Sequence, residues 1–214
     1  MVATAQPHHR STIRRWSSDA LAKSNLEADS ALGPLKTELF SRAQGVVLDI
    51  GAGDCVNRKY LSASANYLAL DPSPNFSASN PLNTQILCSR AELIPLLDQS
   101  VDCVLSSRVL CSVSNLKASL AEIHRVLKPG GRLLFIEHVG APRGTTLRLA
   151  QRVFRPVCRY FEEGCEPDRD IAVTLRASPL VFEELREFRL KLRAPLIQDW
   201  VAGSMVRPRN EGAI

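Results

Sequence analysis

Short continuous runs of apolar residues recur along this chain, and the segments between them mix apolar and polar residues at helical spacing. Continuous apolar runs are typical of parallel strands that are buried on both faces of a sheet. The runs predict strands over residues 46–50, 66–70, 84–88, 101–105 and 132–138. Two later runs, over residues 184–192 and 199–206, predict an antiparallel hairpin that follows them.

Two segments have the periodicity of an amphipathic helix. In the first, one apolar face is formed by Leu116, Leu120, Ile123 and Leu127. The sequence KPGG at residues 128–131 ends this helix, because proline and glycine do not continue it. In the second helix, over residues 145–160, the residues expected to face the core are Leu147, Ala150, Phe154 and Val157.

The alternating order of strands and helices predicts an α/β fold with a doubly wound, open sheet. A chain of 214 residues is long enough for one such domain with a sizeable core. We expect an N-terminal tail and a capping helix in residues 1–42, and the α/β domain in residues 43–214. Ligands of doubly wound sheets bind at the carboxyl ends of the strands, so the candidate site residues are those that follow a strand.

Composition narrows the class of protein. The net charge of +5 comes from interspersed charges of both signs, and aromatic residues are scarce, so we expect no nucleic-acid partner. The six cysteines are scattered, without a CxxC pair or a histidine at ligand spacing, which indicates neither a zinc site nor disulfides. We therefore expect no metal, and a reducing, cytoplasmic location. No apolar run reaches the roughly 18 residues that a membrane-spanning helix needs.

The start of the chain is basic, since Arg10, Arg14 and Arg15 precede the first acid, Asp19. This composition is typical of an organelle transit peptide, and also of a flexible tail that leads into a capping helix at residues 12–28. We favour the tail and keep targeting to an organelle as the alternative.

The first predicted strand runs into a glycine turn, in the sequence VVLDIGAGDC at residues 46–55. A dinucleotide-binding turn has a third glycine, but Val56 stands at that position here. Dinucleotide phosphates would also meet the carboxylates of Asp49 and Asp54, which opposes their binding. S-adenosylmethionine has no phosphate and carries an ammonium group and a sulfonium, so carboxylates beside the turn favour this ligand.

Two further features support a cofactor site. Gly51 and Gly53 let the backbone approach the methionyl part of the cofactor, and Asp49 is expected to hold its amino group directly or through water. Asp71 ends the second strand, where a carboxylate accepts hydrogen bonds from both ribose hydroxyls. A plain tight turn and an Asp-Pro turn explain these residues equally well when each is taken alone. Their combination in a βαβ unit favours the cofactor site.

With these features the sequence resembles a known family, the class I methyltransferases that use S-adenosylmethionine. The resemblance covers most of residues 45–140, in the stretches LDIGAGDC, ALDPSPN, AELIPLLDQSVDCVLSSRVLCSV and EIHRVLKPGGRLLFIEHV. It implies a Rossmann-like, seven-stranded methyltransferase sheet, mostly parallel with a C-terminal antiparallel hairpin, and S-adenosylmethionine as the methyl donor. The cofactor contacts that we expect come from Asp49, Gly51, Ala52, Gly53, Asp71, Pro72, Arg90, Ala91 and Ser106.

In particular, the chain resembles the small thiol S-methyltransferases of the methyltransferase-like group, which in animals are found on microsomal and lipid-droplet membranes. The similar segments are VLCSV, EHV, Gly164-Cys165 followed by Arg169, and RAPL at residues 193–196. The resemblance implies a small acceptor, with a lipophilic thiol preferred. The chain departs from the family at Cys55, where a glycine is usual, and at Arg90, where many relatives have an acid that binds the adenine amino group.

Methyl transfer from a sulfonium mainly requires an aligned acceptor, because the donor is already activated. A thiol with a free pKa of ~8.5 needs only modest help toward the thiolate. Arg108, after the fourth strand, is a candidate for electrostatic help, and His138, at the end of the fifth, is a candidate for taking the proton of the acceptor. A solvated arginine and a structural histidine are the alternatives.

The remaining predictions concern surfaces and cysteines. A basic stripe on the helix over residues 145–160 consists of Arg148, Arg152, Arg155 and Arg159. This stripe is either a solvated face or a contact with anionic lipid. We do not expect an N-terminal membrane anchor in this chain, and the lipid contact would take its place. The cysteines expected to be buried core residues are Cys88, Cys103 and Cys111, and we expect Cys55 and Cys165 to pack rather than react.

Two classes of function stay open. The first is a small-molecule methyltransferase with a thiol acceptor, or alternatively with a hydroxyl, a carboxyl or a quinone-type carbon as acceptor. The second is a non-catalytic partner protein on the same fold. Residues 72–83 (PSPNFSASNPLN) leave little room for a second crossover helix, so we expect an open adenine side of the pocket.

Overall fold

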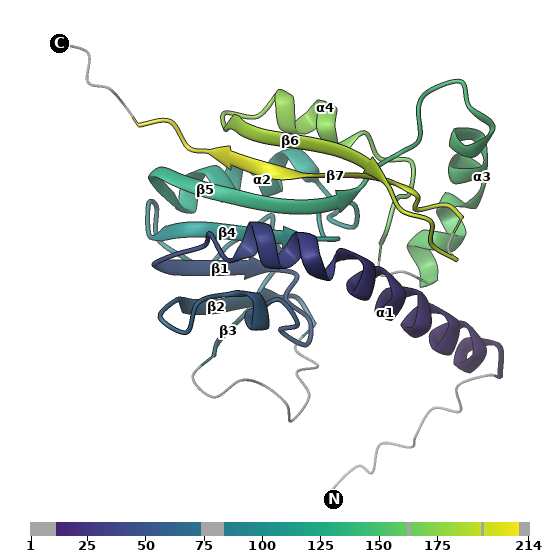
Figure 1. Ribbon diagram of the computed structural model, residues 1–214, viewed down its shortest axis with the longest axis horizontal. Coiled ribbons are helices and arrows are strands. Elements are labelled where there is room, and N and C mark those ends of the chain that lie inside the picture. The colour runs from purple at the N-terminus through teal and green to yellow at the C-terminus, as the bar shows by residue number, and fades with distance from the viewer. Residues whose placement is uncertain (1–11, 74–83, 162–163, 194, 210–214) are drawn as a thin grey trace, which may run out of the picture.

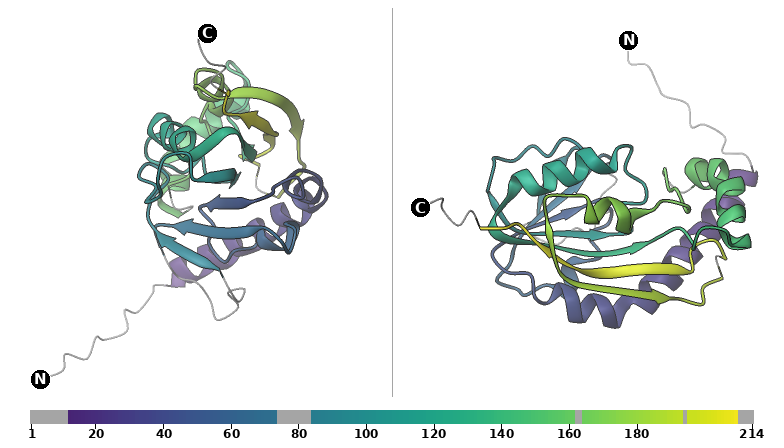
Figure 2. Two further views of the ribbon diagram at one scale, coloured as in Figure 1. Left: turned by 90° about the vertical axis from the view of Figure 1, so that its left-hand side faces the viewer. Right: turned by 90° about the horizontal axis from the view of Figure 1, so that it is seen from above.

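Seven strands form one sheet in the order β3, β2, β1, β4, β5, β7 and β6, with helices on both faces (Figures 1 and 2). The structure is a computed structural model that describes residues 12–73, 84–161, 164–193 and 195–209, with side chains described from residue 26. The sheet confirms the predicted mixed α/β fold of the Rossmann-like kind.

The strands are β1 (Val46–Ile50), β2 (Asn66–Asp71), β3 (Gln85–Cys88), β4 (Val101–Ser107), β5 (Leu127–His138), β6 (Val181–Arg189) and β7 (Asp199–Val206). Strands β1 to β5 pair in parallel, whereas β7 runs antiparallel to both β5 and β6. All seven predicted strands are therefore confirmed. The largest shift is at β5, which begins at Leu127 rather than at residue 132.

Alternate residues of β1 explain how the two faces of the sheet are covered. Val47 belongs to an apolar cluster with Leu32 and Phe40 of α1 (Thr12–Phe40). Leu48 and Ile50 belong to the cluster on the opposite face, where α2 (Leu116–Val126) and α4 (Ile171–Arg176) lie. Figure 2 shows α1 on one side of the sheet and these two helices on the other. Both faces of the parallel strands are thus buried, as their continuous apolar runs predict.

Helix α2 forms where its apolar periodicity predicts it. Asn115 caps its first turn, because its side chain accepts a hydrogen bond from the backbone N–H of Ala118 at 3.1 Å. Leu120 and Ile123 are buried, as expected. Leu127 was expected on the same helical face but instead begins β5.

The other helices differ from the predictions in length. Helix α1 is longer than the predicted capping helix and continues through Pro34 to Phe40. The 3₁₀ helix η1 (Arg58–Tyr60) and the short helix α4 have no clear signal in the sequence. Residues 89–100, between β3 and β4, contain no helix. The prediction for residues 72–83 lies mostly outside the described residues.

Helix α3 (Thr146–Phe161) forms as predicted, but two of its apolar residues face the opposite way from the expectation. Phe154 and Val157 are each 50% exposed rather than buried. The buried side carries Gln151, which accepts a hydrogen bond from Ala141 N–H at 2.8 Å and donates one to the carbonyl of Leu196 at 2.8 Å.

Ion pairs explain this orientation of α3. Arg148 pairs with Asp170 at 2.7 Å, Arg155 with Asp168 at 3.4 Å and Arg159 with Glu166 at 3.3 Å. Three arginines of the predicted basic stripe therefore face the segment that follows the helix. Apolar residues face away from it, and those that are exposed are Leu149, Val153, Phe154, Val157, Tyr160 and Phe161. Among the described residues, no helix has the length and apolar character to cross a membrane.

Candidate functional site

A cavity of about 680 Å³ lies where β1, β2, β4 and β5 end. In this sheet the strand order reverses at β1, which lies between β2 and β4, and ligands of such sheets bind at this reversal. The predicted site residues that line the cavity are Gly51, Asp71, Pro72, Arg90, Ala91, Arg108 and His138. The structure thus brings together predicted residues from five separate segments of the chain.

The glycine turn after β1 forms one wall of the cavity. Gly51 has a φ of +59°, and a Cβ atom at this position would lie 2.5 Å from Cγ2 of Val109. Glycine is therefore strongly favoured, because the left-handed backbone disfavours a side chain and Val109 leaves no room for a Cβ atom. Ala52 and Gly53 belong to the same turn but do not line the cavity. Their expected contacts with a cofactor stay predictions.

Asp49 is completely buried beneath this turn and does not line the cavity. Its carboxylate accepts hydrogen bonds from the hydroxyl of Tyr67 at 2.7 Å and from the side-chain amide of Asn57 at 3.2 Å. Asn57 in turn accepts a hydrogen bond from Nζ of the buried Lys36 at 3.0 Å. Burial raises the pKa of Asp49 to about 6, although the hydrogen bonds from Tyr67 and Asn57 oppose this rise. The expected contact between Asp49 and the donor's amino group stays a prediction.

Asp71 stands at the carboxyl end of β2, on the cavity wall. The backbone N–H of Gly53 donates to its Oδ2 at 3.0 Å, and the N–H of Ser73 donates to its Oδ1 at 2.8 Å. These two bonds fix the carboxylate and connect the glycine turn to the end of β2. Each oxygen retains lone-pair capacity for a further donor, such as a ribose hydroxyl.

Arg108 follows β4 and lies on the cavity wall in a strained backbone conformation, with a φ of +63°. Its guanidinium pairs with Asp29 of α1 at 3.3 Å. Its side chain is only 21% exposed, so the solvated arginine that the sequence left open is not what the structure shows. The structure places a positive charge beside the cavity.

Ser106 does not line the cavity, and its neighbour Ser107 does. The hydroxyl of Ser106 is buried and donates to Oε1 of Glu137 at 2.6 Å, and Glu137 also accepts from the backbone N–H of Val109 at 3.1 Å. Burial raises the pKa of Glu137 to about 7. Ser106 thus supports the loop after β4. Ser107 lines the cavity instead, because successive residues of a strand point to opposite faces of the sheet.

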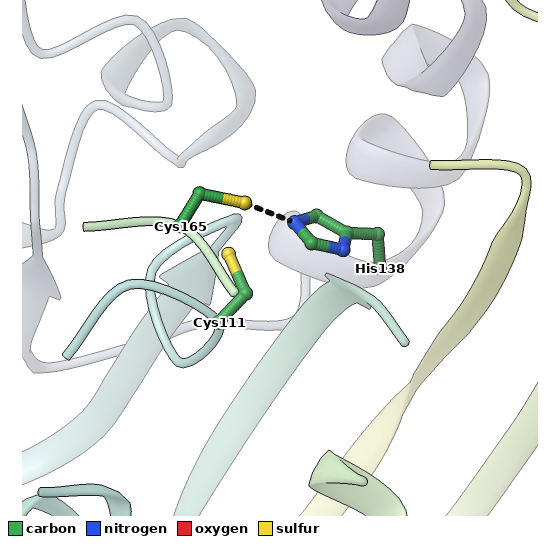
Figure 3. A group of neighbouring side chains, drawn as sticks. All are labelled: Cys111, His138 and Cys165. Atoms are coloured by element: carbon green, nitrogen blue, oxygen red, sulfur yellow. Dashed lines mark hydrogen bonds between the residues drawn. The ribbon is translucent and has the colours of Figure 1, made fainter. Parts of the chain in front are cut away.

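His138, at the end of β5, lies beside two cysteines on the cavity wall (Figure 3). Its Nε2 atom is 3.2 Å from Sγ of Cys165, and Sγ of Cys111 completes a group in which all three atoms lie within 4.8 Å of one another. The hydrogen bond with Cys165 holds the pKa of Cys111 well below its ordinary value, and the neighbouring imidazole acts in the same direction. This geometry brings polarisable, readily ionised groups to the end of the cavity.

The cysteine predictions are confirmed in part. Cys103 and Cys111 are buried as expected, but Cys88 is exposed on β3, which is one of the two edge strands of the sheet. Cys55 is buried in a small cluster with Ala52 and Tyr67, and burial raises the pKa of its thiol, which fits a space-filling role.

Sequence reasoning missed the group formed by Cys111, His138 and Cys165. Neighbouring members are 27 residues apart in the chain, so no local spacing points to them. The only signal was that VLCSV, EHV and Gly164-Cys165 all belong to the resemblance. The topology of β4, β5 and the segment after α3 brings these three stretches together.

Comparison with known proteins shows what this domain is similar to. Residues 48–135 match a family model described as a methyltransferase domain. The geranyl diphosphate C-methyltransferase of Streptomyces coelicolor, solved with S-adenosyl-L-homocysteine, has the same fold, with a TM-score of 0.62 and 14% identity over 83% of this chain and 76% of that one. Residues 48–135 are thus similar to methyltransferase domains, and the sheet has the fold of a solved methyltransferase.

Among curated proteins, the chain is similar to two human thiol S-methyltransferases. It is 34% identical to human TMT1B over 67% of this chain and 64% of that protein. It is 27% identical to human TMT1A over 91% of this chain and 87% of that protein. The match thus spans a little less than two thirds of TMT1B and most of TMT1A.

The buried carboxyl of Asp49 predicts how stability depends on pH. Because its folded pKa of about 6 lies above the ordinary 3.8, the folded state holds this proton more tightly than the unfolded state. Its stabilising contribution is complete below pH ~4 and is lost as the pH rises through ~6, a change of about 3 kcal/mol. We expect the Asp49→Asn variant to lack this loss of stability. The measurement is the free energy of unfolding in urea at several pH values between ~4 and ~8.

Asp54→Asn is the matched control, because Asp54 lies in the same turn and is exposed. It should leave the pH dependence of the free energy of unfolding as in the wild type. Parallel pH curves for the wild type and the Asp49→Asn variant would contradict the role assigned to the Asp49 carboxyl.

Proposed function

We propose that this chain transfers the methyl group of S-adenosylmethionine to the sulfur of a small, lipophilic thiol. The observation that carries the proposal is that Gly51 of the glycine turn lines the same cavity as the group formed by Cys111, His138 and Cys165. The similarity to TMT1A and TMT1B supports the thiol as acceptor.

The donor binds in this proposal at the ends of β1 and β2. The turn at Gly51 receives the methionyl part, and Asp71 accepts hydrogen bonds from the ribose hydroxyls. Pro72, Arg90 and Ala91 line the neighbouring wall, where we place the adenine. Asp49 lies beneath the turn, and its carboxylate accepts hydrogen bonds from Asn57 and Tyr67, so we propose that it supports this wall from the buried side.

The acceptor binds at the ends of β4 and β5. His138 lies there beside the two thiols, and we propose that it favours the deprotonated form of the acceptor sulfur. The positive charge of Arg108 on the same wall stabilises a thiolate. An anionic sulfur and the sulfonium methyl of the donor then meet within one cavity, which is the alignment that methyl transfer requires.

The outer face of α3 is our proposed contact with a lipid surface. Its exposed apolar residues include Leu149, Val153 and Val157, which are 64%, 63% and 50% exposed. Three of the four arginines of this helix pair with acidic residues of the following segment, so the exposed apolar side chains carry the proposed contact. A lipophilic acceptor would be concentrated at such a surface. We propose a cytoplasmic location, since none of the six cysteines forms a disulfide.

The acceptor class is tested with thiols, phenols and carboxylic acids of matched size, after calorimetry has shown that S-adenosylmethionine binds. We expect kcat/KM to be at least about tenfold higher for thiols than for phenols, because a thiol (pKa ~8.5) ionises more readily than a phenol (pKa ~10). Equal or higher values for the phenols or acids would overturn the thiol proposal.

The role of His138 is tested with His138→Ala. We expect kcat for a thiol acceptor to fall by about 10²-fold, while the Kd for S-adenosylmethionine changes little, because the imidazole acts at the acceptor end of the cavity. His124→Ala, on the outer helix α2, is the control and should keep the wild-type kcat. An unchanged kcat in His138→Ala would remove this residue from the mechanism.

The lipid contact is tested by co-sedimentation with vesicles of phosphatidylcholine and phosphatidylserine. Val153→Asp should weaken vesicle binding by at least about tenfold, because it places a charge where an apolar side chain would enter the interface. Val173→Asp is the matched control, since Val173 is also exposed but lies on α4. Equal binding by the two variants, or no binding by the wild type at low salt, would contradict the proposed surface.

A further inference from the structure

The group formed by Cys111, His138 and Cys165 has the features of a binding site for a soft metal ion. Figure 3 shows the two sulfur atoms and Nε2 of the imidazole pointing toward one another. All three side chains are buried, and their ligand atoms lie within 4.8 Å of one another. Donor atoms around a tetrahedral zinc ion are roughly 3.5 to 3.8 Å apart, so small side-chain rotations suffice to enclose one.

Backbone hydrogen bonds hold the three segments in place independently of any ligand. The N–H of Glu166 donates to the carbonyl of Cys111 at 3.0 Å, which ties the loop of Cys165 to the loop of Cys111. Arg169 donates to the carbonyls of Leu110 at 2.9 Å and Val113 at 2.6 Å, on either side of Cys111. Such support is needed for a metal site, because donors that must be gathered from a flexible chain bind weakly.

The orientation of His138 is also determined by its surroundings. Its ring makes an edge contact with the indole of Trp200, with centroids 5.8 Å apart, and this leaves Nε2 directed at the cysteines. Metal-binding histidines require a fixed ring orientation of this kind.

We propose that these three residues bind a zinc ion, and that the open fourth position of the ion binds the sulfur of the thiol acceptor. Two thiolates and one imidazole are donors that zinc prefers, and two thiolates neutralise its charge in a buried site. Three protein ligands with one open position are typical of catalytic zinc, and here the open side faces the cavity because all three residues line it. The acceptor part of the proposal rests on the proposed function.

The chemistry balances without a further reactant. The acceptor thiol releases its proton to solvent when its sulfur binds zinc. A lone pair of this sulfur attacks the methyl carbon as the bond from that carbon to the donor sulfonium breaks, and the bonding pair stays on the sulfur of S-adenosylhomocysteine. The thioether product is neutral and binds zinc weakly, so it leaves. His138 thus favours the thiolate by holding the metal.

The test measures metal directly, on the full chain. The chain is purified with a phosphine reductant and without chelators, and zinc is quantified by mass spectrometry. We expect about one zinc ion per chain. Cys111→Ser and Cys165→Ser should bind zinc at least about tenfold more weakly, in competition with a chromophoric chelator. The exposed Cys88→Ser is the matched control and should bind as the wild type does.

Cobalt replaces zinc as a spectroscopic probe of the wild type, so the proposal does not depend on variants that must fold. We expect thiolate-to-cobalt absorption bands that shift when 2-mercaptoethanol is added, because the added sulfur takes the fourth position. Absence of these bands, or zinc retention that is equally low in all proteins, would overturn the site. Bands that do not respond to the thiol would overturn the acceptor role.

Failure of the metal site and failure of the proposed function give different results. Thiol methylation at the full rate by a chain stripped of metal would overturn the zinc proposal and leave thiol methylation standing. Bound zinc in a chain that methylates only phenols or acids would uphold the site and overturn its role toward a thiol acceptor.

Discussion

The burial of one carboxylate, Asp49 at the end of β1, constrains the donor side of this molecule. A buried carboxylate is costly unless polar partners surround it. Here those partners come from β2, through Tyr67, and from the segment after the glycine turn, through Asn57. Lys36 of α1 reaches the same network through Asn57 and is itself 1% exposed. The requirement to satisfy Asp49 therefore fixes the relative positions of α1, β1, β2 and the turn.

The opposite end of the cavity depends on a second polar connection. Arg169 ties the segment after α3 to the loop that follows β4, and Gly140 N–H donates to the carbonyl of Arg169 at 3.0 Å, which adds the end of β5. Arg108 connects the two ends, since it lies on the cavity wall and pairs with Asp29 of α1. The cavity thus has rigid walls built by ion pairs and backbone hydrogen bonds, which is the preorganisation that a methyl transfer needs.

Sequence reasoning recovered the parts of this structure that depend on local patterns. Strand β1 and the turn at Gly51 could be predicted because a buried strand and a left-handed glycine each have a recognisable pattern within a few residues. The predicted orientation of α3 was wrong because periodicity shows that a helix has an apolar face but not whether that face lies toward the core or toward solvent. That choice depends on Asp168 and Asp170, which pair with arginines from outside the helix. Cys111, His138 and Cys165 come together only through the topology of the whole sheet. Their spacing along the chain therefore does not predict that they are neighbours.

The polarity of the cavity suits the reaction that we propose. A sulfonium cation and a thiolate anion combine to give two neutral thioethers, so charge disappears as the transition state forms. Surroundings with little water destabilise such separated charges more than the transition state, and this lowers the barrier. His138 and Cys165 are only 3% and 4% exposed, so the acceptor sulfur would be held where water is largely excluded. Asp71, in contrast, lies at the more open rim, where a polar ribose is bound at little cost. A polar donor end and a shielded acceptor end therefore match the charge changes of the proposed methyl transfer to sulfur.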